Sequence, residues 1–219
     1  MKKNLTELVF ILDRSGSMCY LVDDTIGGFN SMIEEQKKED GEAYVTTVLF
    51  DGQYELLHDH VNITDVEPIT RKEYYARGNT ALLDAVGTTI NSIGTRLYET
   101  PEDERPEKVI FVITTDGHEN ASMEFSKSQI KEMIEHQQDV YSWVFMFLGA
   151  NMDAVSEAAS YGIKSAYSKT YTASAQGTSS VYASSSKAIS DIRGIDTSCT
   201  MDWMDCALSS VEAALDSVV

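Results

Sequence analysis

The chain has 219 residues, of which 42% are hydrophobic, and this length and composition fit one domain with a sizeable core. Asp and Glu number 35 and Lys and Arg number 17, so the formal net charge is −18. This charge argues against nucleic acid and anionic membranes as partners, because both attract clustered Lys and Arg. It favours cations and basic protein surfaces instead.

Neither an export signal nor a membrane span is expected. The first apolar run, residues 8–12, is far shorter than the roughly 18 residues of a membrane helix. The three cysteines are odd in number and lack zinc-like spacing, and Cys199 and Cys206 would lie about 10 Å apart in a helix, beyond disulfide reach. We therefore predict a cytoplasmic protein, with Cys19 as a small buried residue.

Strand and helix patterns alternate from the start of the chain. Residues 8–12 form a continuous apolar run, which is typical of a strand buried on both faces. Apolar residues at every third or fourth place between 26 and 33 predict a helix. Two strands follow, joined at Asp51 by an Asp-Gly pair that predicts an antiparallel hairpin.

The later pattern continues the alternation, with a helical stripe that begins near residue 81. The expected elements after it are strands at 109–114, 140–148 and 163–167, with helices near 130–134, 152–160 and 178–192. This order predicts an α/β fold of the Rossmann-like class. We expect a doubly wound, mostly parallel six-stranded sheet with one antiparallel edge strand and helices on both faces.

The end of the chain has a helical pattern of its own. We expect one domain over residues 1–192 and a tail over 193–219. Apolar side chains at helical spacing in the tail are Met204, Leu208, Val211, Leu215 and Val218. The tail helix is expected to pack on its own domain, and the alternative is an exposed helix that docks another protein.

Oxygen-bearing side chains follow the predicted strands at three places. Ligands of open α/β sheets bind beyond the carboxyl ends of the strands. The candidate metal ligands in the segments 13–17, 77–80 and 115–117 are Asp13, Ser15, Ser17, Thr80 and Asp116. Taken singly, Thr80 could cap a helix and Asp116 could belong to an ordinary turn. Together, two carboxylates and three hydroxyls suit a hard cation such as Mg²⁺.

These segments resemble the metal-ion-dependent adhesion site of von Willebrand factor A domains. The resemblance covers residues 5–192 in element order and leaves 193–219 outside it. One departure is Asn79, where many members carry a second glycine. The resemblance implies that the three hydroxyls bind Mg²⁺ directly, with Mn²⁺ as an alternative, and that the two carboxylates act largely through bridging waters.

The resemblance also implies a binding module rather than an enzyme. Neutral hydroxyls leave a dication under-neutralised, so it would favour an incoming carboxylate at an open position. The expected partner is a protein with an exposed Asp or Glu, such as an AAA+ ATPase or another assembly factor. Arg77, Asn79 and His118 are candidates for the rim around that partner.

Two other functions compete with this interpretation. A metal-dependent phosphoryl hydrolase could use Asp13 as its nucleophile. However, Ser15 stands where the haloacid-dehalogenase type needs a second Asp as general acid. A structural subunit that docks through the C-terminal helix is the other alternative.

Overall fold

The computed structural model describes residues 1–197 and 203–216, which contain one six-stranded sheet in the order β3-β2-β1-β4-β5-β6. The strands are β1 (Lys2–Asp13), β2 (Glu42–Phe50), β3 (Tyr54–Asn62), β4 (Pro106–Thr115), β5 (Val144–Ala150) and β6 (Ser168–Tyr171). Every neighbouring pair is parallel except β2 and β3, which form the expected hairpin at one edge. The predicted fold class is therefore confirmed.

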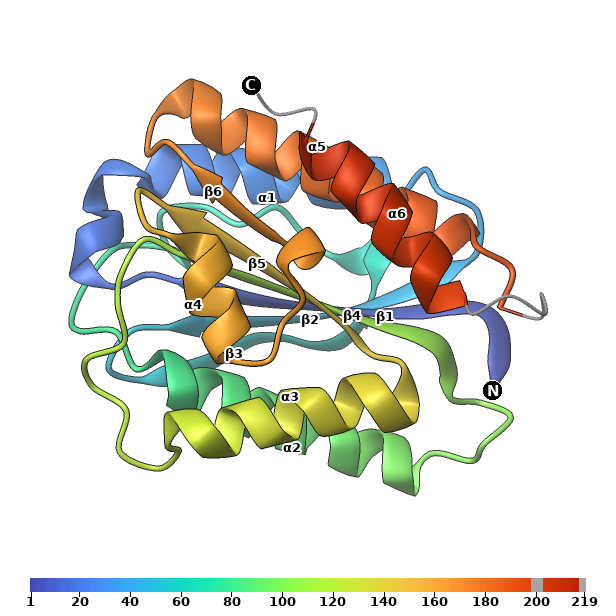
Figure 1. Cartoon of the computed structure of the whole chain (residues 1–219). Coiled ribbons are helices and arrows are strands. Elements are labelled where there is room, and N and C mark those ends of the chain that lie inside the picture. Colours follow the sequence, from blue (N-terminus) through green and yellow to red (C-terminus); the bar gives the residue numbers. More distant parts are fainter. Residues whose placement is uncertain (198–202, 217–219) are drawn as a thin grey trace.

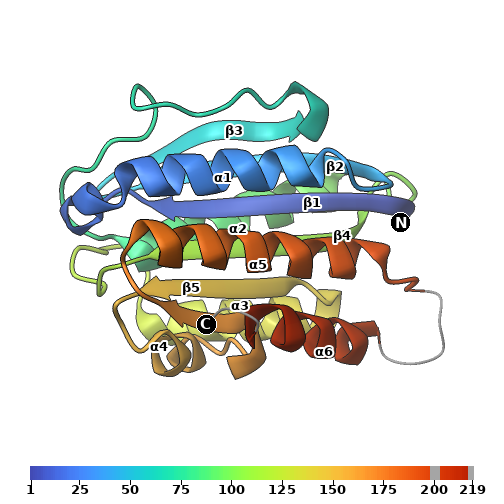
Figure 2. The same ribbon diagram turned by 90° about the horizontal axis from the view of Figure 1, so that it is seen from above.

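Helices cover both faces of the sheet, as Figures 1 and 2 show from two directions. The α-helices are α1 (Val22–Gln36), α2 (Leu82–Glu99), α3 (Lys127–Tyr141), α4 (Ala154–Ser160), α5 (Ala175–Gly194) and α6 (Trp203–Asp216). Helices α1 and α5 lie over one face, and α2 and α3 lie over the other. This double cover explains why the residues 8–12 of β1 are all fully buried.

The strand order positions the candidate site. From β1 the chain builds β2 and β3 on one side, and β4 then returns to the other side of β1. The connections that leave β1 and β4 therefore diverge at the carboxyl ends of these two strands. Asp13 is the last residue of β1, and Thr115 is the last residue of β4.

Two predicted strands are shifted in the structure. The strand expected at 140–148 begins only at Val144, because α3 continues to Tyr141 and ends at Ser142 in the left-handed conformation. The expected strand at 163–167 does not form: residues 165–167 make a 3-10 turn, and β6 follows it. The amide of Ile163 donates to the Ala158 carbonyl, so this residue closes α4 instead of joining the sheet.

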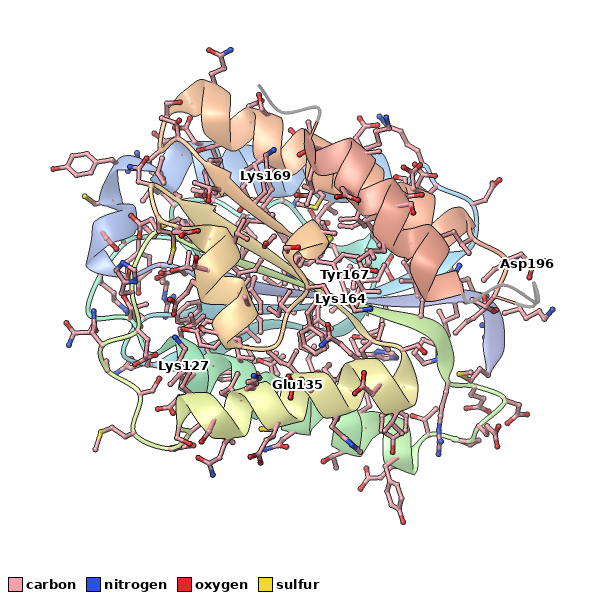
Figure 3. The ribbon with its side chains drawn as sticks, in the orientation of Figure 1. Lys127, Glu135, Lys164, Tyr167, Lys169 and Asp196 are labelled. Atoms are coloured by element: carbon pink, nitrogen blue, oxygen red, sulfur yellow. The ribbon has the colours of Figure 1, made fainter. Side chains whose placement is uncertain are left out.

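Lys127 is one of the residues that join α3 to α4. Figure 3 labels Lys127 at the start of α3, where its ammonium lies 3.2 Å from the Glu157 carboxylate. The same ammonium lies 4.8 Å from the centre of the Tyr161 ring. This contact holds α4 beside α3 at the β5–β6 edge of the sheet.

The tail helix α6 lies along α5 (Figure 1). Its buried side chains are Ala207, Val211, Ala214 and Leu215. The Lys108 ammonium donates to the carbonyls of Arg193 and Ile195, which holds the end of α5 against β4. Cys199 and Val218 lie outside the described residues, and so do the side chains of Met204 and Cys206. Across the described part of the chain, every helix is too short or too polar to cross a membrane.

Candidate metal site

Three loops meet at the carboxyl ends of β1 and β4, and backbone hydrogen bonds join them. The Gly16 amide donates to the Gly78 carbonyl at 3.1 Å, and the Arg77 amide donates to the Arg14 carbonyl at 2.8 Å. The Asn120 amide donates to the carbonyl of Thr80 at 3.0 Å. These bonds bring the 13–17, 77–80 and 115–120 segments into one cluster.

Asp13 is the innermost acid of this cluster, with no exposed surface. One carboxylate oxygen accepts from the Ser15 amide at 2.6 Å, and the other accepts from the Thr115 hydroxyl at 2.6 Å. Burial raises the pKa of Asp13 to about 6, although these hydrogen bonds oppose the shift. A cation beside this carboxylate would offset the cost of burying its charge.

Ser15, Ser17 and Asp116 form a chain of hydrogen bonds. The two serine hydroxyl oxygens lie 3.0 Å apart, and the Ser17 hydroxyl donates to an Asp116 carboxylate oxygen at 2.5 Å. Partial burial raises the pKa of Asp116 as well. The two serines thus lie between the two carboxylates, with the Ser15 amide on Asp13 and the Ser17 hydroxyl on Asp116.

Thr80 is brought to the same place by the turn after β4. A methyl group added at Gly117 would lie 3.1 Å from the Thr80 hydroxyl oxygen and 3.3 Å from the Ser17 hydroxyl oxygen. Gly117 therefore leaves open a small space that both hydroxyls border. The structure brings together all five residues that the sequence indicates as ligands: Asp13, Ser15, Ser17, Thr80 and Asp116.

The chemistry of this cluster fits a hard divalent cation. Its side-chain donors are two carboxylates and three hydroxyls, the oxygen ligands that Mg²⁺ and Mn²⁺ accept. Among the side chains that the structure describes, no group of three or more His, Cys, Asp or Glu residues is arranged to hold a metal. A cation at this site would therefore need the hydroxyls as further ligands.

The three candidate rim residues differ in their surroundings. Asn79 and His118 are exposed beside the cluster. The Arg77 guanidinium instead donates to the Asp51 carboxylate at 2.6 Å and to the Tyr75 hydroxyl at 3.1 Å. Arg77 is thus half-buried in a side-chain network, and only part of it faces solvent.

Sequence reasoning missed several residues that support the site. The Arg14 guanidinium is fully buried and donates to Asp51 at 3.2 Å and to Glu55 at 2.7 Å. Thr115 holds Asp13, and the buried Tyr74 hydroxyl donates to the Asp13 backbone carbonyl. The position of Thr115 at a strand end, next to a candidate ligand, is a signal that could have identified it.

Two more loop residues were missed or misjudged. Glu119 accepts from the amides of Leu83, Ala121 and Ser122, so it caps the start of α2 beside Thr80. Cys19 is exposed, so the expectation of a buried cysteine is wrong. The chain turns there through a short 3-10 helix, which buries the neighbouring Met18 instead.

No protein-family model matches the sequence, and a comparison with curated proteins finds no relative. Solved structures do resemble the fold. One is proximal thread matrix protein 1 from the mussel byssus, with a zinc-occupied MIDAS (metal-ion-dependent adhesion site) motif. Its TM-score is 0.59 at 18% identity, and the match covers 87% of this chain and 47% of that protein. The chain thus spans about half the length of that protein.

Two further structures resemble it at similar levels. Manganese-loaded TRAP protein of Plasmodium vivax has a TM-score of 0.57 and 16% identity, over 78% of this chain and 70% of its own. A von Willebrand factor type A protein from Catenulispora acidiphila has a TM-score of 0.55 and 12% identity, over 96% of this chain and 43% of its own. At these identities the likeness establishes the fold: the chain has the fold of von Willebrand factor A domains.

Proposed function

We propose that this chain is a metal-dependent protein-binding module of the von Willebrand factor A family. Mg²⁺ would be held by the hydroxyls of Ser15, Ser17 and Thr80, with the carboxylates of Asp13 and Asp116 behind them. The observation that carries this proposal is the gathering of these five oxygen donors from three loops at one end of the sheet. Two solved structures of similar fold are described as zinc-occupied and manganese-loaded.

The partner in this proposal is a protein that offers an exposed Asp or Glu. The bound dication would supply an electrophilic centre, and the neutral hydroxyls around it leave charge for a carboxylate to neutralise. His118 and Asn79 stand exposed where such a partner would approach. An AAA+ ATPase or another assembly factor as the partner, and a cytoplasmic location, stay predictions from the sequence.

Binding is favoured over phosphoryl transfer by the surroundings of Asp13. Both of its carboxylate oxygens accept hydrogen bonds inside the fold, and the side chain has no exposed surface. A nucleophile needs an oxygen that can reach the substrate. Turnover of p-nitrophenyl phosphate that disappears in Asp13→Asn would establish the hydrolase instead.

The first test is a titration of Mn²⁺ into the protein, with free metal followed by electron paramagnetic resonance and Mg²⁺ added as competitor. We expect one site per chain that Mg²⁺ displaces, and a loss of about tenfold or more in affinity in Asp116→Ala. Gly117→Ala should also weaken binding, since its methyl group would crowd the Thr80 and Ser17 hydroxyls. Gly94→Ala is the matched control, because a methyl group there meets open space.

The result that contradicts the metal site is diffuse binding that is equal in all these variants. In that case the net charge of −18 merely attracts cations. Partner recognition is tested separately with an array of Asp-containing peptides. Binding should require Mg²⁺ and should be lost when Asn replaces Asp in the peptide.

A further inference from the structure

A cavity lies at the opposite end of the sheet from the candidate metal site. It has a volume of about 510 Å³, a size typical of ligand pockets. Residues of α2, the start of β4 and the end of α3 line it, so it opens at the amino-terminal ends of the parallel strands (Figure 1). Its main apolar lining residues are Ile90, Leu97, Val109, Trp143, Tyr98 and Tyr141.

The floor and the rim of this cavity differ in exposure. Ile90, Val109 and Trp143 are almost completely buried, so they form a fixed apolar floor. Tyr98 is 83% exposed and Tyr141 is 60% exposed, although both carry large rings. Exposed aromatic residues around a preformed apolar cavity are typical of protein interaction sites.

The rim is strongly acidic on the side of the loop that joins α2 to β4. Residues 99–107 contain five acids and one base. Glu102 and Glu107 line the cavity, and Glu99 and Asp103 are exposed in the same stretch of chain. Arg105, the one base, donates to the carbonyls of Thr100 and Tyr98, so its guanidinium holds the loop in shape.

We propose that this cavity is a second docking site, which takes a basic segment of a partner protein. One apolar side chain of the segment inserts between α2 and α3, and flanking Lys or Arg side chains lie beside Glu99 and Glu102. The charge of the rim selects this occupant over an acidic segment or a second copy of this chain, which itself carries −18. The site is independent of the metal, since it lies at the other end of the strands.

The test uses the full chain in the presence of a chelator and a fluorescein-labelled Lys-Lys-Leu-Leu-Lys-Lys peptide, followed by fluorescence anisotropy. We expect binding that weakens about tenfold or more when Glu replaces every Lys, or when Ser replaces both Leu residues. The Glu99→Gln/Glu102→Gln double variant should weaken binding several-fold and reduce its salt dependence.

The cavity itself is tested by filling it. A methyl group built at Gly94 in α2 meets open space, so Gly94→Leu should place its side chain in the cavity and weaken peptide binding about tenfold or more. Gly27→Leu in α1 is the matched control, because that helix position is equally open and lies on the other face of the sheet. It should leave the affinity unchanged.

Four outcomes would overturn the proposal. The basic apolar peptide could fail to bind at millimolar concentration, or the Ser-containing peptide could bind equally well. Binding that is unchanged in Gly94→Leu would show that the acidic surface alone attracts the peptide. Self-association of the wild-type chain that Gly94→Leu abolishes would identify a second copy of the chain as the occupant instead.

Discussion

Asp13 and Arg14 are neighbours in the sequence, and both are completely buried. Their side chains contact different groups. The Asp13 carboxylate accepts from the Ser15 amide and the Thr115 hydroxyl, and it forms no ion pair with any basic side chain that the structure describes. The Arg14 guanidinium points away, into the Asp51 and Glu55 carboxylates of the β2–β3 hairpin. Because the two charges have separate partners, the acid stays available for a cation.

His58 in β3 is another polar residue that the fold partly buries. Its Nδ1 lies 3.0 Å from the Thr47 hydroxyl oxygen, and its ring stacks on Phe29 with the centroids 6.5 Å apart. Burial lowers the pKa of His58 below its usual value of 6.5. The folded state therefore binds fewer protons on this ring than the unfolded state does.

The sign of this shift predicts how stability depends on pH. Above pH 6.5, His58 should have little effect on how the free energy of unfolding changes with pH. As the pH falls below 6.5, His58 should lower that free energy. In His58→Gln, urea unfolding should show a smaller loss of stability between pH 7.5 and pH 5.5, a range of about two units around the ordinary histidine pKa. An equal loss in both proteins would show that other groups cause it.

Among the contacts between secondary-structure elements, the close packing of α1 against α5 depends on one glycine, Gly28. A methyl group at Gly28 would lie 2.4 Å from a ring carbon of Tyr182, which is itself buried against α1. Gly27, one residue earlier, faces open space. The two glycines weaken the helix equally, but only Gly28 permits the close approach of the two helices.

Two substitutions separate these roles. Gly28→Ala should lower the free energy of unfolding by about 1–3 kcal/mol, because overpacking outweighs the gain in helix propensity. Gly27→Ala should raise it by up to about 1 kcal/mol, since only the propensity changes. Chemical denaturation of both variants measures the difference. Equal stability of the two would mean that α5 can move away from α1 without cost.

The whole molecule presents its two candidate interaction sites at opposite ends of the strands. The candidate metal site lies where β1 and β4 end, and the apolar cavity lies where β4 begins. Helix α6 packs along α5 (Figure 2), and none of its described side chains lines the cavity. The separation would let two partners bind one chain at the same time.

Stability measurements also test whether the tail helix belongs to the domain. Leu215 of α6 is 2% exposed, so Leu215→Ala should cost about 2–4 kcal/mol if α6 stays docked in solution. Glu212→Ala is the control on the exposed side of the same helix and should change stability by less than about 0.5 kcal/mol. If Leu215→Ala has no effect, the tail is the exposed docking helix that the sequence left open.

Much of the fold follows from local patterns that do not need a tertiary structure. Burial on both faces makes β1 continuously apolar, and the Asp51-Gly52 pair determines the one antiparallel pairing. The boundaries of β5 and β6 were mispredicted for a physical reason. β5 begins late because α3 continues to Tyr141, whereas β6 extends only where β5 residues 147–150 offer it hydrogen bonds.

The sequence by itself determined the order of the elements, the chemistry of the five candidate ligands and the acidic character of the surface. Those properties depend on residue type and on spacing along a few turns of chain. The tertiary structure decided the pairing of Arg14 with Asp51, the exposure of Cys19 and the cavity between α2 and α3. Each of these depends on which surfaces meet across long stretches of chain, and local periodicity carries no information about that.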